Sequence, residues 1–384
     1  MLVDFKLNGF TTFNKEIDLS FIGNKDIKNT DNVFMVNNKR ILKSLIIYGP
    51  NNTGKTNLIF SLSLLKDMIQ KGTILDVFTE SDLLYNFFND EKIIDFEIEF
   101  ISNNTDFKYY LSINEGKISK EILYVDDKLL FNRFGEVIDD EMRNAVELLK
   151  NYSDKLIIKT LPMKYKKYVD AINEFFAKMY IVNSFMFDNL VDDIDNLSEE
   201  ELDKFNKIIK KADISIEKVK LEKNAFKNKK YQLISYYKMN NKSESAPSYV
   251  VDSSGTRVFM YYILQIIKCK RNGGILVVDE IDSHLHTLLT KTLISLFNDE
   301  CNMNMQLLTT SHDLLLLDTK YLFRKDQIYF TYKDKNEVLL YSLNSFKDNK
   351  DKGIRNNALK SYLKGYFGAL PNPDLYNIFY TIGT

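Results

Sequence analysis

An eight-residue segment near the N-terminus constrains the fold of this chain more than any other feature. Residues 49–56 read GPNNTGKT, which fits the pattern GxxxxGK[ST] in full. The apolar run Leu45–Tyr48 precedes this segment, and an apolar stretch with helical spacing, Leu58–Ile69, follows it. A buried strand, a glycine-bounded loop and a helix therefore follow one another, which predicts an α/β fold with a phosphate-binding loop.

The loop carries the residue types that bind a nucleoside triphosphate. Its backbone N–H groups converge on phosphate oxygens, and the positive end of the following helix adds to the attraction for an anion. Lys55 is expected to reach the β- and γ-phosphates of ATP, and the Thr56 hydroxyl to bind Mg²⁺. The alternative, a glycine turn that happens to contain a lysine, leaves the flanking strand and helix unexplained. The predicted nucleotide-binding residues here are Gly49, Asn51, Asn52, Thr53, Gly54, Lys55, Thr56 and Asn57.

A second apolar run, Ile275–Val278, ends in the acidic pair Asp279-Glu280. Acids at the carboxyl end of a parallel strand can place Asp279 on the metal ion and Glu280 as general base on the attacking water. An apolar run followed by two acids is common by itself. Together with the phosphate loop, it predicts the second half of one catalytic site.

A second phosphate-binding segment is predicted at DSSGTR, residues 252–257, which opens the apolar stretch Val258–Ile267. Small hydroxyl and glycine residues at a helix start let a phosphate approach the exposed N–H groups. Because one chain rarely needs two phosphate cradles for one nucleotide, we expect Ser253, Ser254 and Gly255 to contact a nucleotide bound by a partner subunit. An ordinary serine N-cap is the alternative.

All three histidines of the chain fall in this C-terminal stretch. The predicted strand Leu307–Ser311 ends at His312, whose imidazole could sense the γ-phosphate. His284 and His286 form a His-x-His pair, but no cysteine, third histidine or spaced carboxylate set completes a tetrahedral zinc site.

The pattern along the chain predicts three parts. Residues 1–136 form the N-terminal half of an ATPase domain: period-two alternation predicts a β-hairpin at its start and antiparallel strands between Ile94 and Phe134. Residues 137–215 form a helical insertion, in which Ser198 and Glu201 make a capping box. Residues 216–384 form the C-terminal half, with strands from Ile216 to Met239 and a polar loop over 240–248.

Composition excludes several classes of protein. A net charge of −1 gives no general basic surface for nucleic acid, so any such surface is a local patch. Two cysteines supply no disulfide framework, and no apolar run approaches the roughly 20 residues that span a bilayer. We therefore expect a cytoplasmic protein with no membrane partner.

The ordered set GPNNTGKT, DSSGTR, ILVVDEID and TTSH, with the opening MLVDFKLNGFTTFN, resembles the ABC-type ATPases related to RecF, SMC and OLD proteins. KRILKSLIIYGPNNTGKTNL, RKDQIYF and YLKGYFGALP look like segments of the compact ATPases of bacterial abortive-infection and other anti-phage systems. The resemblance implies an ABC-ATPase head with an antiparallel β subdomain and a helical insertion. It also implies a head-to-head homodimer with ATP between one subunit's phosphate loop and the other's DSSGTR segment.

The resemblance further implies residue roles. It places Lys55 and Thr56 on phosphate and Mg²⁺, and Asp279 on Mg²⁺. Glu280 would be the general base, and His312 would stand at the switch position. Ser253 and Gly255 would contact the γ-phosphate of the partner's nucleotide, and Asp282 would lie in the loop that couples the two sites. Two departures stand out. DSSGTR stands where transporters and SMC proteins have LSGG followed by Gln or Glu. No glutamine has the context of the loop that joins the metal to the insertion, for which Gln70 and Gln232 are candidates.

The leading functional hypothesis is an ATP-gated sensor or scaffold in anti-phage defence that controls a separately encoded nuclease or toxin. The alternative is a RecF- or SMC-like DNA repair or maintenance ATPase that clamps DNA. A transporter subunit is disfavoured by the opening hairpin, the large insertion and the divergent DSSGTR segment. The stretch after Asp313 is too short for the nuclease domain that OLD-type proteins carry.

Overall fold

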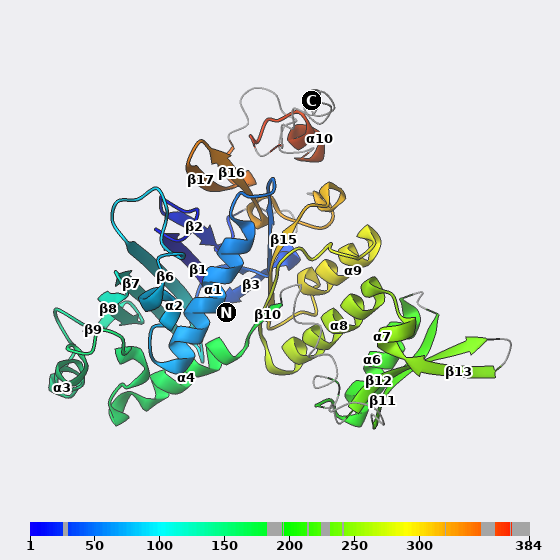
Figure 1. Cartoon of the computed structure of the whole chain (residues 1–384), viewed down its shortest axis with the longest axis horizontal. Coiled ribbons are helices and arrows are strands. Elements are labelled where there is room, and N and C mark those ends of the chain that lie inside the picture. Colours follow the sequence, from blue (N-terminus) through cyan, green and yellow to red (C-terminus); the bar gives the residue numbers. More distant parts are fainter. Residues whose placement is uncertain are drawn as a thin grey trace.

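The computed structural model describes residues 1–25, 30–182, 194, 196–212, 215–223, 231–239, 242–318, 320–346, 358–368 and 370. In this part of the chain an antiparallel sheet, a mostly parallel sheet with helices on both faces and a small three-stranded lobe lie side by side (Figure 1). Among these residues no helix combines the length and the apolar character needed to cross a bilayer.

The N-terminal sheet is antiparallel and has the strand order β2-β1-β6-β7-β8-β9. Its inner face buries the alternating apolar residues, for example Ile94, Phe96 and Ile98 on β6, and this confirms the predicted hairpin and antiparallel strands. A short hairpin of β3 and β4 adjoins it. The strands are β1 (Leu2–Asn8), β2 (Ile17–Ser20), β3 (Val33–Val36), β4 (Lys39–Leu42), β6 (Ile93–Ser102), β7 (Thr105–Asn114), β8 (Lys117–Val125) and β9 (Lys128–Asn132).

The central sheet has the order β10-β14-β15-β5-β16-β17. Its first five strands are parallel, and β17 runs antiparallel to β16. Strands from the two ends of the chain thus interleave, because β5 lies between β15 and β16. The strands are β5 (Ser44–Tyr48), β10 (Met179–Val182), β14 (Gly274–Val278), β15 (Met305–Ser311), β16 (Ile328–Asp334) and β17 (Glu337–Ser342).

Alternate residues of the central strands enter two separate cores, which explains why these strands read as continuous apolar runs. Leu45 and Ile47 face the core shared with the N-terminal sheet, whereas Ile46 and Tyr48 face the core on the other side. The first core is covered by α1 (Lys55–Lys71) and α4 (Lys166–Ala177), and the second by α8 (Ser254–Asn272) and α9 (Thr287–Asn298).

A small lobe packs against α8 at the far end of the molecule from the N-terminal sheet (Figure 1). It consists of α6 (Glu199–Lys211) and the antiparallel sheet β11 (Ile216–Lys223), β12 (Tyr231–Met239) and β13 (Lys242–Pro247), followed by α7 (Ser248–Val251). The capping box of Ser198 and Glu201 at the start of α6 is confirmed. The described part of the chain also contains α2 (Asp76–Glu80), α3 (Asp140–Leu149) and α10 (Ala358–Leu363).

Two predictions about local structure need correction. The polar loop expected over 240–248 contains β13, because its backbone hydrogen-bonds to β12 and an edge strand needs no apolar alternation. The range 137–215, expected to be helical, also supplies β10 to the central sheet, where it pairs with β14. The three-part division of the chain stays a prediction.

Candidate nucleotide-binding site

The carboxyl ends of β5, β14 and β15 meet at one edge of the central sheet, and the predicted motifs follow directly from these ends. Residue 49 follows β5, Asp279 follows β14 and His312 follows β15. Parallel pairing brings the ends together, since Tyr48 lies opposite Ser311 and Val278 lies opposite Thr309. Ligands of open α/β sheets bind at this edge.

Two glycines allow the phosphate loop to take its shape. A side chain on Gly49 would place its Cβ 2.1 Å from Thr331 Oγ1, and one on Gly54 would place it 2.8 Å from Phe13 Cζ. Gly54 also has a φ of +85°, which favours glycine, and it begins α1 without a side-chain cap. The first N–H groups of α1 are therefore available to a phosphate.

Lys55 lies over this loop in a buried position. Its Nζ donates to the carbonyl oxygens of Gly49 at 2.8 Å and Pro50 at 2.9 Å, and the residue is 6% exposed. Burial lowers the pKa of Lys55, while the negative charges of Asp279, Glu280 and Asp282 raise it and so oppose the shift. The lysine and the acids, more than 220 residues apart in sequence (279 minus 55 is 224), thus act on one another within one site.

Thr310 fixes the acidic pair after β14. Its buried hydroxyl donates to Asp279 Oδ1 at 2.6 Å and accepts the Glu280 N–H at 2.7 Å. One hydroxyl therefore orients the carboxylate of Asp279 and the backbone of Glu280 together. Glu280 itself has a φ of +54°, which turns the chain away from the strand.

His312 lies close to two of the three acids that follow β14, Glu280 and Asp282. Its Nε2 lies 3.7 Å from Glu280 Oε1, and its backbone N–H points to the Asp282 carboxylate at 3.2 and 3.3 Å. His312 and Glu280 are both partly exposed, so a γ-phosphate and a water molecule can reach them. This arrangement can hold a general base beside a triphosphate and sense its terminal group.

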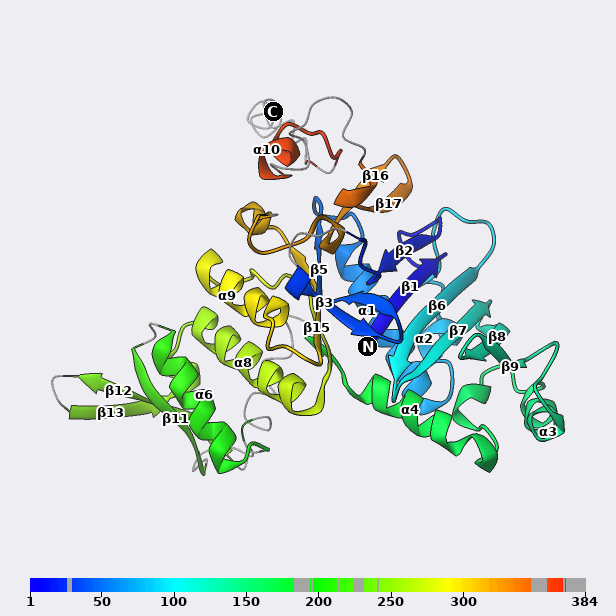
Figure 2. The same ribbon diagram turned by 180° about the vertical axis from the view of Figure 1, so that it is seen from behind.

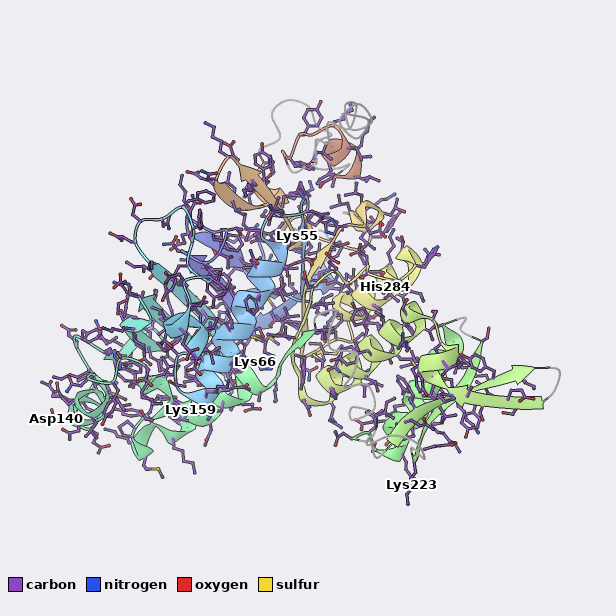
Figure 3. The ribbon with its side chains drawn as sticks, viewed as in Figure 1. Lys55, Lys66, Asp140, Lys159, Lys223 and His284 are labelled. Carbon is purple, nitrogen blue, oxygen red and sulfur yellow. The ribbon has the colours of Figure 1, made fainter. Side chains whose placement is uncertain are left out.

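The DSSGTR segment begins α8 away from the phosphate loop of its own chain. Ser253 caps this helix by accepting the Thr256 N–H at 3.1 Å, and Ser253 and Ser254 are exposed. Ser253 is thus the N-cap of α8, and the start of the segment lies on the surface, while its contact with a partner's nucleotide stays a prediction. Gly255 packs against the loop after the acidic pair, because a Cβ there would lie 2.4 Å from the His284 carbonyl oxygen. His284 and Lys55 lie apart in Figure 3.

Other sequence candidates lie away from the loop. His286 caps α9, with its Nδ1 accepting the Leu288 N–H at 3.2 Å. Gln70 lies at the end of α1, about 22 Å from Lys55 for 15 residues at 1.5 Å each. Gln232 lies in β12, in the small lobe. Neither glutamine is at the nucleotide site, so the coupling glutamine is unassigned.

Sequence reasoning missed four residues that shape the site. Thr331 Oγ1 on β16 lies 2.6 Å from Thr53 Oγ1, and Thr310 orients the acids as described. Thr12 and Phe13, in the loop after β1, pack on Gly54. Thr310 stands two residues before His312 in the TTSH motif, and Thr12 and Phe13 stand in the opening MLVDFKLNGFTTFN, whereas Thr331 lies in no such motif.

The donor set fits a magnesium-bound triphosphate. The loop offers uncapped helix N–H groups and a lysine, the exposed Thr56 hydroxyl stands in the first turn of α1, and Asp279 supplies a carboxylate. Hydroxyl and carboxylate oxygens are the protein ligands that Mg²⁺ takes beside phosphate. The fold and this site define a P-loop ATPase head of the ABC class.

Comparisons with known proteins agree with that class. Residues 44–318 match the family model described as "AAA domain, putative AbiEii toxin, Type IV TA system", and the chain belongs to this family. No curated protein matches the sequence.

The chain is also similar to solved structures of SMC heads. An SmcHead bound to the C-terminal winged-helix domain of ScpA is 11% identical, with 89% of this chain and 97% of that chain covered and a TM-score of 0.51. The SMC head domain from Thermotoga maritima is 12% identical, with 89% and 98% covered and a TM-score of 0.46. A Pyrococcus furiosus Smc head with an extended coiled coil is 12% identical, with 89% and 96% covered and a TM-score of 0.47. The match above 0.5 supports the ABC-ATPase fold.

Proposed function

We propose that this protein hydrolyses ATP between two copies of the chain. The observation that supports the proposal is the separation of the two segments that the sequence predicts to bind phosphate. Lys55 lies near Asp279, Glu280 and Asp282, while Ser253 and Ser254 lie exposed at the start of α8. A two-fold dimer places the second segment of each subunit over the nucleotide of the other, which gives both segments a ligand.

Within this proposal each residue has one role. Lys55 neutralises the β- and γ-phosphates, and Thr56 and Asp279 hold Mg²⁺, which polarises the phosphate oxygens when bound. Glu280 accepts the proton of the attacking water as the bond between the γ-phosphorus and the bridging oxygen breaks, releasing ADP and phosphate. His312, 3.7 Å from Glu280, contacts the γ-phosphate and holds this carboxylate in place.

Glu280→Gln tests the proposal. The amide keeps the shape of the side chain but accepts no proton, so ATP binds and is not cleaved. We expect this variant to form a stable dimer in ATP and Mg²⁺ by light scattering coupled to gel filtration, and to stay monomeric without ATP. Lys55→Ala is the matched control and stays monomeric in both conditions. A Glu280→Gln protein that remains monomeric in saturating ATP contradicts the sandwich.

We further propose that the ATP-driven dimer controls a separate effector in anti-phage defence, in the cytoplasm. The support is the family, whose description names a toxin and a toxin–antitoxin system. Purification of tagged Glu280→Gln from its native host should enrich a nuclease or toxin encoded beside it. If the same dimer instead binds duplex DNA in a salt-sensitive manner and enriches no such protein, the DNA-clamp function replaces this one.

A further inference from the structure

The residue directly before the exposed phosphate-binding segment is a buried carboxylate. Asp252 is 8% exposed, and it lies between α7 and the N-cap residue Ser253. A buried carboxylate costs free energy unless hydrogen bonds compensate for its lost hydration. The burial of the Asp252 carboxylate at the start of α8 therefore requires hydrogen-bond donors around it.

Three hydroxyl groups provide the compensation, and two of them come from the small lobe. Ser235 Oγ and Ser248 Oγ donate to Asp252 Oδ2 at 2.6 Å and 2.5 Å, and the Tyr237 hydroxyl donates to Oδ1. Ser235 and Tyr237 are both on β12, and Ser248 begins α7. Hydrogen bonds to a charged acceptor are stronger than those between neutral groups. Asp252 therefore joins the start of α8 to the middle strand of the three-stranded sheet.

The other end of α8 is joined to the same lobe. Arg271 forms an ion pair with Glu201 of α6 at 3.1 Å, and Phe205 and Ile209 of α6 belong to the core that α8 shares. The exposed ion pair contributes little by itself. With the buried Asp252 cluster, however, the lobe holds α8 at both ends. β12 and β13 extend outward from this point, away from the rest of the molecule (Figure 2).

We propose that Asp252 is a positioning residue that fixes Ser253–Gly255 to the small lobe, so that the lobe sets where this segment meets the nucleotide of the partner subunit. The proposal rests on the proposed ATP dimer and adds to it. The hydroxyls of Ser235, Tyr237 and Ser248 hold the carboxylate in one orientation, and the backbone of Ser253 follows directly from it. Its effect is therefore on the ATP of the other subunit.

The test combines Tyr237→Phe and Ser248→Ala, which remove two of the three donors and leave Asp252 in the chain. ATP turnover of this double variant should fall roughly tenfold, the effect of losing hydrogen bonds to a charged group. Ser245→Ala is the matched control, because Ser245 is exposed on β13 only three residues from Ser248. It should hydrolyse ATP at the wild-type rate.

Mixed dimers show whether the double variant loses activity because Ser253–Gly255 is misplaced at the partner's nucleotide or because its own subunit is damaged. Subunits carrying Lys55→Ala have an intact Ser253–Gly255 segment but no working phosphate loop. Subunits with the double substitution have an intact phosphate loop but a misplaced Ser253–Gly255 segment. In a dimer that contains one subunit of each kind, one of the two sites is wholly native, so turnover of the mixture should rise above that of either variant alone. Turnover that stays low shows that the double variant damages its own subunit, and this overturns the proposal.

A third mixture distinguishes this failure from that of the dimer itself. Ser253→Arg places a large side chain where the phosphate is expected, and its mixture with Lys55→Ala should also recover. If Ser253→Arg recovers and the double variant does not, the dimer stands and the role of Asp252 is wrong. If Ser253→Arg also fails to recover, the ATP sandwich is wrong.

Discussion

Replacing Thr310 by valine should slow ATP hydrolysis by a factor of about 10 to 100. The substitution keeps the shape of a side chain that is fully buried and removes only its hydroxyl. That hydroxyl donates to Asp279 at 2.6 Å and accepts the Glu280 N–H at 2.7 Å. A hydrogen bond to a charged group is worth about 1.5–3 kcal/mol, and about 1.4 kcal/mol corresponds to a tenfold change in rate.

Thr309→Val is the matched control for this prediction. Thr309 is equally buried, and its hydroxyl hydrogen-bonds to the carbonyl oxygens of Val278 at 2.9 Å and Thr310 at 3.1 Å, away from the acids. Each variant should lose about 1–3 kcal/mol in the free energy of unfolding, because each removes one buried hydroxyl. Steady-state turnover at saturating ATP and urea denaturation measure the two effects. Equal turnover by the two variants would refute the view that Thr310 orients the catalytic acids.

Three further predictions follow from buried groups. Gly49→Ala should abolish ATP binding measured by calorimetry, because the added Cβ meets Thr331 Oγ1 at 2.1 Å. Arg133→Met should lower the free energy of unfolding by about 3–5 kcal/mol in urea, since it leaves the fully buried Glu121 carboxylate without its ion-pair partner at 2.7 Å. Burial raises the pKa of Asp4 from 3.8 to about 7, so the folded state holds a proton that the unfolded state releases, and stability falls as pH rises between about 4 and 7. Asp4→Asn should flatten this part of the stability profile.

Each of these predictions has a clear contrary outcome. Wild-type affinity for ATP in Gly49→Ala would show that the loop can move away from β16. A loss below about 1 kcal/mol in Arg133→Met would show that Glu121 is protonated when folded, in keeping with the upward effect of burial on its pKa. An Asp4→Asn protein that retains the wild-type loss of stability between pH 4 and 7 would assign that loss to another group.

The sequence alone predicted those parts of the site that are formed by residues adjacent in the chain. The phosphate loop, the acids after β14 and the helix after Ser253 each follow from neighbours in the chain, and residues 44–318 lie in one family. Contacts between distant segments were not accessible in this way. Thr331 reaches Thr53 only because β16 pairs with β5, and no sequence pattern around either threonine predicts this pairing.

Short strands show the same limit. β10 has four residues and follows α4 after a single residue, so its apolar pattern continues that of the helix. Its strand conformation comes from pairing with β14, 96 residues later in the chain (275 minus 179 is 96). β13, with the sequence KSESAP, has no apolar alternation because it is an edge strand of the small lobe. In both cases a long-range partner determines the local structure.

The interleaving of β5 between β15 and β16 affects how this protein is made. Until residue 305 has left the ribosome, β5, a strand from the first 50 residues that is fully buried in the folded protein, has no neighbouring strand on either side. Pairings that join such distant parts of a chain form slowly, and an unpaired apolar strand promotes aggregation in the meantime. We therefore expect newly made chains to need chaperone protection, and fragments that end before β15 to be insoluble.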